Sequence, residues 1–205
     1  MNQRAVLALW LGLGMVGLAQ ATTPVCEVAA LVGEARSGDT PLKSGSSLKV
    51  GDELQTGAKS RVRLRCIDGS SLVLAENSQL RIESFSAEGA QRKDARFFLR
   101  LGLVGQKVSA GGAWTLRTPS AVTAVRGTEF VVEVPAEDKT AVLMQSGSVD
   151  VQPAKPQTRS IAAALPLIAL AGLMGTDCVM GKGCSAAKPW SEARVKATLD
   201  RLSGV

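Results

Sequence analysis

The chain has 205 residues, with 24 Lys and Arg against 18 Asp and Glu, and it contains neither His nor Tyr. Without His, the sequence excludes Ser-His-Asp and Cys-His catalysis and lacks the commonest protein metal ligand. Residues 22–152 hold 16 basic and 15 acidic side chains, so they carry no electrostatic footprint for nucleic acid. We therefore expect no catalytic, cofactor or metal site and no nucleic-acid partner.

The first 21 residues have the organisation of a secretory signal peptide. Arg4 supplies a short positive start, residues 5–18 are apolar apart from glycines, and residues 19–21 form a small-x-small cleavage site. The apolar core is shorter than the roughly 20 residues that a membrane helix needs. Cleavage after Ala21 is therefore favoured over a retained anchor, and we expect an exported, periplasmic protein.

Residues 25–151 consist of short alternating runs separated by turn residues, a pattern that is typical of strands. Asp68-Gly69 between two such runs is a strong hairpin signal, because glycine adopts the positive φ that primed turns require. The pattern predicts an all-β fold, either a two-layered β-sandwich or a short β-solenoid-like domain. The expected strands are residues 27–35, 53–56, 61–67, 71–75, 79–83, 96–101, 105–108, 113–118, 121–125, 129–134, 140–145 and 148–152.

The cysteines Cys26, Cys66, Cys178 and Cys184 all follow the predicted cleavage site, and an even number in an exported protein indicates disulfides. Strand parity places Cys26 and Cys66 on the buried face, whereas Cys178 and Cys184 flank a loop that contains glycine. We favour the pairs Cys26–Cys66 and Cys178–Cys184. The alternatives are unpaired buried thiols and, for Cys178 and Cys184, a metal site that two thiolates would leave incomplete.

The carboxy-terminal quarter of the chain has a different composition. Residues 153–160 contain two prolines and are predicted to be a linker, followed by an apolar and helical tail over residues 161–205. Residues 161–175 would span roughly 22 Å as a helix, less than the roughly 30 Å hydrocarbon core of a bilayer. We expect this segment to dock on the β domain or to contact a membrane peripherally; a membrane span with a basic cytoplasmic tail is the alternative. We expect a final helix over residues 189–202.

An ordered set of short motifs runs through residues 46–152 and ends in Val-Arg-Gly-Thr-Glu-Phe followed by Gln-Ser-Gly-Ser-Val. This set resembles the FecR family, whose periplasmic domains relay signals about iron-carrier uptake. The resemblance implies a FecR-like β domain, which we place at residues 22–152, and it implies no enzymatic residues. The residues that carry it are Gly51, Asp52, Asp68, Gly69, Thr118, Pro119, Arg126, Gly127, Thr128, Glu129, Phe130 and Gly147.

Each motif also has a purely structural interpretation. We expect Gly127 to permit a tight bend, and Arg126 and Glu129 to pair with each other or to satisfy backbone groups there. Direct contact with a partner is the alternative for these two charges. Phe130 is expected in the core, whereas Trp114 fits either the core or an exposed position.

The resemblance, together with one departure from the family pattern, limits the functions that we expect. Family members that regulate σ factors carry a cytoplasmic segment ahead of one membrane span, and only a signal peptide is expected before Thr22 in this sequence. The leading hypothesis is a non-catalytic periplasmic sensing or interaction module in cell-envelope signalling or assembly, which acts by contact with an envelope protein. A β domain that binds glycan or cell-wall ligands, with Trp114 stacking on a sugar, is the alternative.

Overall fold

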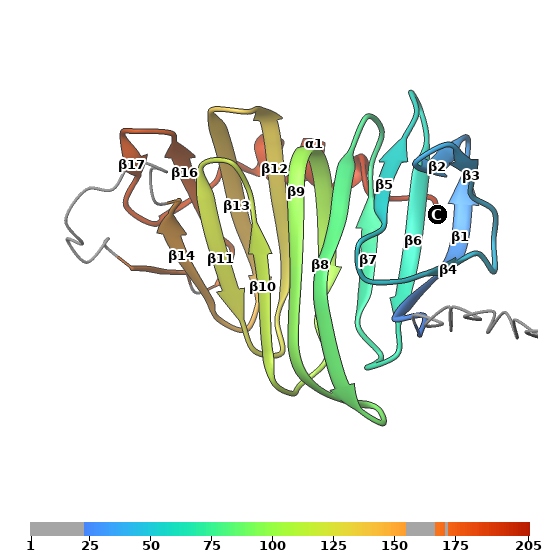
Figure 1. The fold of residues 1–205 in the computed structure, drawn as a ribbon. Coiled ribbons are helices and arrows are strands. Elements are labelled where there is room, and N and C mark those ends of the chain that lie inside the picture. The colour runs from blue at the N-terminus through green and yellow to red at the C-terminus, as the bar shows by residue number, and fades with distance from the viewer. Residues whose placement is uncertain (1–22, 155–166, 171) are drawn as a thin grey trace, which may run out of the picture.

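The computed structural model describes residues 23–154, 167–170 and 172–205. Strands dominate these ranges and form two sheets that face each other, with a single helix of the described residues on the outside (Figure 1). The fold is therefore all-β with a small helical appendage at the carboxy terminus, which confirms the predicted fold class. The predicted signal peptide and residues 155–160 of the predicted linker lie outside the described residues.

The two sheets are built almost entirely from antiparallel pairs. The strands are β1 (Cys26–Val32), β2 (Ala35–Ser37), β3 (Thr40–Pro41), β4 (Ser47–Leu48), β5 (Glu53–Thr56), β6 (Arg61–Cys66), β7 (Ser71–Leu74), β8 (Gln79–Glu88), β9 (Gln91–Lys107), β10 (Ala113–Arg117), β11 (Ala121–Val125), β12 (Glu129–Ala136), β13 (Lys139–Ser146), β14 (Val149–Pro153), β15 (Ile168–Leu170), β16 (Met174–Val179), β17 (Gly183–Cys184) and β18 (Lys188–Pro189). The helix is α1 (Glu192–Asp200).

Sheet A has the strand order β4-β1-β6-β7-β9-β12-β13-β16, and both β17 and β18 pair with β16. Sheet B has the order β3-β2-β5-β8-β9-β10-β11-β14-β15. Strands β9 and β10 run parallel, and the other pairings among the described strands are antiparallel. Strand β9 appears in both sheets and therefore joins the two layers.

Strand β9 changes sheets at Gly102. Its first part, up to Leu101, pairs with β8 in sheet B, and its last part pairs with β12 in sheet A from Gly102 onward. Gly102 has φ +98°, and a Cβ there would lie 2.4 Å from the Cα of Ser78. Only glycine fits this close approach without strain. The two strands expected at residues 96–101 and 105–108 are thus one continuous strand with a bend.

Inward-facing side chains of the two sheets form one core. Leu64, Leu74 and Phe130 of sheet A belong to the same buried cluster as Leu80 and Phe97 of sheet B. Alternation along each strand supplies this core, because successive side chains point to opposite faces. The packing of two sheets around shared apolar side chains matches the sandwich form of the prediction.

The two disulfides join cysteines that are directly opposite each other in neighbouring strands. Cys26 of β1 bonds to Cys66 of β6, and Cys178 of β16 bonds to Cys184 of β17. This is the pairing that strand parity and loop spacing favoured. It also leaves no free cysteine in the described residues.

The tail differs from its prediction. Residues 161–166 lie outside the described residues, but Ile168–Leu170 and Met174–Val179 are strands, so the helix expected for residues 161–175 is wrong there. Strand β15 extends sheet B beyond β14, and β16 extends sheet A beyond β13. Over the described ranges, no helix combines the length and the apolar character that crossing a membrane requires.

Helix α1 forms near the expected position and packs on the outer face of sheet A. The Ser191 hydroxyl caps it by accepting a hydrogen bond from the Arg194 backbone N–H, and Glu192 lies in its first turn. A second buried cluster forms beneath the helix from Trp190, Leu199 and Leu202 on one side and Leu103, Val131 and Leu143 on the other.

Ion pairs fix the two ends of this helical segment. The Arg201 guanidinium contacts the carboxylates of Glu76 and Glu133, and Arg194 pairs with Asp177 of β16. Burial raises the pKa of Glu76, but hydrogen bonds from the backbone and from Arg201 outweigh it and leave that pKa below its ordinary value. The hydrogen bond from Arg194 lowers the pKa of Asp177 in the same way, against a smaller effect of burial.

Candidate interaction site

Four connections meet at one end of the sandwich, and we call them the motif end: residues 67–70, 108–112, 126–128 and 146–148. The backbone N–H of Ser109 donates to the Ser70 hydroxyl at 3.0 Å, and that of Val108 donates to the Thr128 carbonyl at 2.9 Å. The Thr128 hydroxyl in turn donates to the Ser148 carbonyl at 3.0 Å. These bonds join loops of both sheets into one surface.

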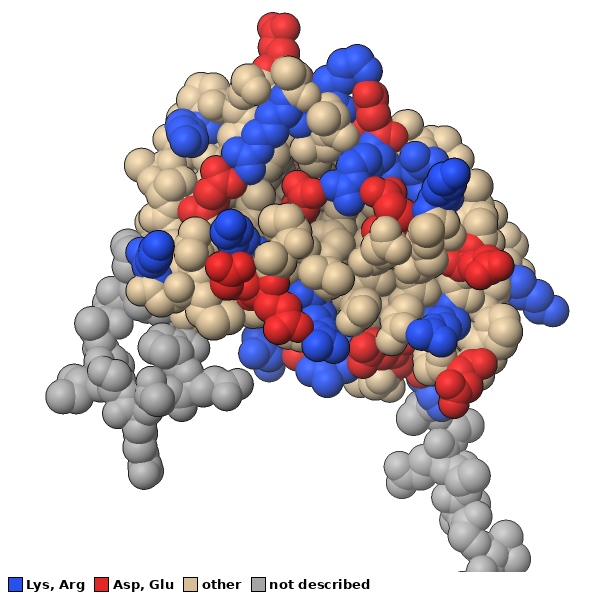
Figure 2. All heavy atoms as spheres, turned by 90° about the horizontal axis from the view of Figure 1, so that it is seen from above, with Lys and Arg blue, Asp and Glu red and all other residues tan. Residues whose placement is uncertain are grey.

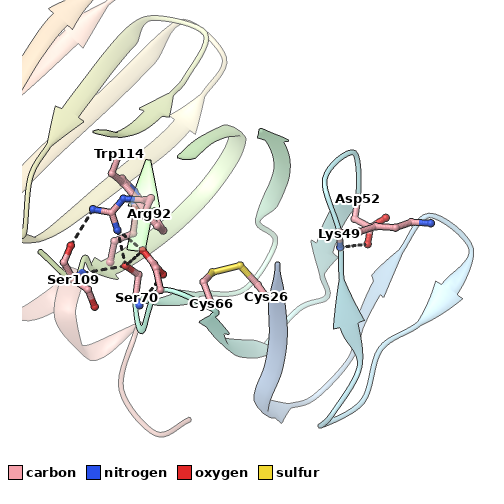
Figure 3. The surroundings of a disulfide bond; sticks show 10 residues. Cys26, Lys49, Asp52, Cys66, Ser70, Arg92, Ser109 and Trp114 are labelled. Carbon is pink, nitrogen blue, oxygen red and sulfur yellow. Dashed lines mark hydrogen bonds and ion pairs between the residues drawn. A yellow bond between two sulfur atoms is a disulfide. The ribbon is translucent and has the colours of Figure 1, made fainter. Parts of the chain in front are cut away.

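A buried ion pair between Asp68 and Arg92 underlies the motif end. Figure 3 shows Arg92 of this pair together with Ser70 and Ser109. The Arg92 guanidinium donates to the Asp68 carboxylate, and it also donates to the carbonyls of Ser109 and Gly112 at 2.9 and 3.0 Å. The other carboxylate oxygen of Asp68 accepts from the Ser70 backbone N–H at 3.0 Å. Because both charges are hydrogen-bonded on several sides, the loops are held in a defined arrangement.

Trp114 lies in the core next to this network and is fully buried. Its ring stacks on Phe97 with the centroids 4.6 Å apart, and its indole N–H donates to the Gln106 side chain at 2.8 Å. The Arg92 guanidinium lies 5.2 Å from the ring centroid. The structure therefore excludes the exposed position on which sugar stacking by Trp114 depended.

The motif Arg126–Phe130 divides into an exposed part and a buried part. Arg126 and Gly127 are exposed on the turn between β11 and β12, whereas Thr128 and Phe130 are buried. The expected pairing of Arg126 with Glu129 is wrong: neither side chain makes a hydrogen bond or an ion pair within the described residues. Arg126 thus presents a free guanidinium to solvent from a turn whose neighbours are fixed.

Glycines shape the turns in which the motif residues lie. Gly51, Gly69, Gly127 and Gly147 all have positive φ, at +96°, +81°, +70° and +91°. Gly147 also packs against the motif, since a Cβ there would lie 3.1 Å from a methyl carbon of Thr128. Gly69 follows Asp68 in the β6–β7 hairpin, as the sequence predicts.

Two motif pieces lie away from the motif end. Asp52 closes a turn before β5, where its carboxylate accepts from the Lys49 backbone N–H at 2.9 Å; Figure 3 shows this turn apart from the Arg92 network. Thr118, followed by Pro119, lies at the opposite end of the sandwich, with its hydroxyl 2.7 Å from that of Thr140. Both pieces are turn-forming elements, and the structure does not bring them together with Arg126.

Arg92 is the site residue that the sequence did not reveal. Alternation from the buried residues Ala95, Phe97 and Leu99 places position 92 on the outward face. The pairing of β8 with β9 shifts register between Ser86 and Ala87, and Arg92 turns inward after this irregularity. The burial of Arg92 could therefore not be predicted from the alternation, because the bulge reverses the expected direction of its side chain.

The charged surface is mixed. In the view from above, basic and acidic side chains are interspersed over the face, with no broad area of one sign (Figure 2). Among the described residues, no group of three or more Cys, Asp or Glu side chains is arranged to hold a metal ion.

Comparison with known proteins found one family model that matches part of the chain. Residues 52–150 match the family model described as FecR protein. No curated protein matches the chain. The match lies within the range expected from the motifs and confirms that residues 52–150 resemble the FecR family.

Two crystal structures, each of a proposed anti-sigma factor from Parabacteroides distasonis ATCC 8503, share the fold. The 1.65 Å structure has a TM-score of 0.56 and 18% sequence identity, and the alignment covers 72% of this chain and 64% of that chain. The 2.50 Å structure has a TM-score of 0.55 and 19% identity, with coverage of 72% and 63%. The chain thus spans less than two thirds of these solved structures. The likeness shows that this chain and the two solved structures share a fold.

Proposed function

We propose that this protein is a non-catalytic interaction module of the bacterial cell envelope that acts in signalling or assembly by contact with another protein. The observation that carries the proposal is the position of Arg126, the exposed charged residue of the motif Arg126–Phe130. It is exposed and unpaired within the described residues, on a turn held by buried neighbours. An arginine presented from a fixed turn suits recognition of a partner carboxylate, because its planar fork loses little freedom on binding.

Export to the periplasm is part of the proposal. Two disulfides support it, since such bonds persist in oxidising compartments. The fold likeness to proposed anti-sigma factors supports a role in regulation. Removal of the amino-terminal segment after Ala21 would release the domain outside the cytoplasm.

The test compares charge reversal at Arg126 with charge reversal at a matched site. The full chain, exported with its own amino-terminal segment and tagged after Val205, is cross-linked in cells and purified from envelope extracts. R126E is expected to recover less than a tenth of the partner that wild type recovers. K139E is the control, because Lys139 is also exposed but lies on the β12–β13 hairpin at the other end.

Two outcomes would contradict the proposal. Recovery of no specific partner by wild type at any salt concentration would remove the interaction role altogether. Equal recovery by wild type, R126E and K139E would show that a partner exists but does not depend on the motif end.

A further inference from the structure

A groove of about 380 Å³ runs along the outer face of sheet A beside the carboxy-terminal end of α1. Val73 contributes to its sheet side, and Leu199 and Leu202 of the helical segment form an apolar wall. Three cations, Arg63, Arg65 and Lys107, line the same groove, and all three are exposed. The groove thus combines an apolar wall with a basic rim.

Strand register explains why these charges gather. Arg65 of β6 is opposite Ser71 of β7, which is opposite Lys107 of β9, and Lys107 is opposite Glu129 of β12. Directly opposite residues place their side chains on the same face of a sheet. Arg63 lies two residues before Arg65 on β6 and shares this face. The groove therefore carries three cations against one carboxylate, that of Glu129.

The two arginines of the groove are unusual in having no partner. In the described ranges, every arginine makes a side-chain hydrogen bond or an ion pair except Arg63, Arg65 and Arg126. Most of the other guanidinium groups pair with a carboxylate, whereas Arg36 and Arg61 donate to neutral oxygens of Gln55 and Arg201. Along this groove three cations face a single carboxylate, and the excess of positive charge attracts a negatively charged ligand.

We propose that this groove binds an acidic, extended segment of the partner protein, a proposal that rests on the proposed interaction function. Carboxylates of the segment pair with Arg63, Arg65 and Lys107, and an apolar side chain packs on Leu199 and Leu202. A hydrophobic wall with charged groups at its rim is the usual anatomy of such contacts. The groove adjoins the motif end, because Glu129, which lines the groove, directly follows residues 126–128 of that end.

The shape favours a peptide over a membrane surface. The apolar wall lies in a groove beside α1, so a flat bilayer would reach the rim but not the wall. The Glu129 carboxylate within the same row repels anionic headgroups, whereas a peptide can place a neutral or basic residue there. Anionic vesicles therefore serve as the competing probe in the experiment.

The experiment measures binding of a short fluorescein-labelled peptide of Glu with interspersed Leu by fluorescence anisotropy. The protein is the full oxidised chain, compared with its R63Q/R65Q variant. Loss of two exposed charge pairs is expected to weaken binding about tenfold. The matched control, K139Q/K182Q, removes the same charge from exposed positions away from the groove and is expected to leave affinity unchanged.

Three results would overturn the proposal: absence of peptide binding by wild type, equal weakening in the control, or equal binding of a peptide with Gln in place of Glu. Preferential binding to vesicles that contain anionic phospholipid would assign the groove to a membrane surface instead. Recovery of the cross-linked partner separates this proposal from the proposed function. If R63Q/R65Q retains a partner that R126E loses, the interaction function stands and the groove assignment fails.

Discussion

The Arg92 guanidinium contacts the Asp68 carboxylate across the interior of the motif end, with the two side chains only 0% and 2% exposed. Arg92 is the second residue of β9, in its sheet B part, and Asp68 lies in the hairpin between β6 and β7 of sheet A. One ion pair therefore ties together the two sheets at the end that carries Arg126. Its further hydrogen bonds to Ser70, Ser109 and Gly112 extend the tie to the neighbouring loop.

Removing one partner of this pair is expected to be costly. D68N leaves the Arg92 charge buried without a counter-ion and should lower the free energy of unfolding by about 3–5 kcal/mol. R100Q is the control, because it breaks the exposed Arg100–Glu137 pair and should cost at most about 1 kcal/mol. Urea unfolding of the oxidised chain at neutral pH measures both. Equal losses for the two variants would contradict the structural role of Asp68.

The bend in β9 makes Gly102 sensitive to any side chain. G102A adds a Cβ that collides with the backbone of Ser78 at a positive φ, and the expected loss of stability is at least about 3 kcal/mol. Gly89 also has a positive φ but has open space around it, so G89A should cost only about 1–2 kcal/mol. Thermal unfolding of the two variants compares them directly. A milder effect at Gly102 than at Gly89 would show that the bend tolerates a side chain.

The docking of α1 is expected to weaken in acid. The folded chain holds the pKa values of Glu76 and Asp177 below their ordinary values of 4.5 and 3.8. Their contribution to stability is therefore complete above those ordinary values and is lost as pH falls through the lowered ones. R201Q should cost about 1 kcal/mol at pH 7 and progressively less as the pH falls through this range.

Urea unfolding of wild type and R201Q at a series of pH values tests this prediction. The control is K196Q, which breaks an exposed pair within α1 and leaves the contact with sheet A intact. A difference between wild type and R201Q that stays constant down to the acid range would mean that Arg201 stabilises the fold without the titrating carboxylates.

The two disulfides are expected to contribute unequally. Cys26–Cys66 closes a segment with a sequence separation of 40, whereas Cys178–Cys184 closes one of 6. Chain entropy predicts losses of about 4 kcal/mol for C26A/C66A and about 2 kcal/mol for C178A/C184A. Denaturant unfolding against the oxidised wild type gives both values. A larger loss for C178A/C184A would indicate that the β16–β17 turn supports more of the fold than its loop length implies.

Alternation and turn residues were sufficient to predict most strands between residues 25 and 153. Strands β5 and β11 begin and end at the predicted residues, because in each of them buried and more exposed side chains alternate strictly between two turns. The same reasoning predicted two strands in place of β9, because the glycine at position 102 interrupts the alternation in the sequence. The fold of this region was therefore predictable, but the crossing between sheets was not.

The structure of the tail and the burial of two residues near the site could not be predicted from the local sequence. Strands β15 and β16 form because β14 and β13 offer open edges, so tertiary context overrides an apolar run that suggested a helix. Arg92 faces inward because of a register shift in the β8–β9 pair. Trp114 is buried because Phe97, seventeen positions earlier, lies beneath its ring. Each outcome depends on a neighbour that is distant in sequence.

The attachment of β15 to β14 and of β16 to β13 has a consequence for how the protein can be shortened. The family match ends at residue 150, yet a chain cut there would lose both β15 and β16. An edge that these strands cover would then be exposed in each sheet. Exposed edge strands present rows of unpaired backbone N–H and C=O groups, which can pair with strands of other chains. The segment that matches the family model is thus smaller than the folded unit, because β15 and β16 cover the edges that β14 and β13 would otherwise expose.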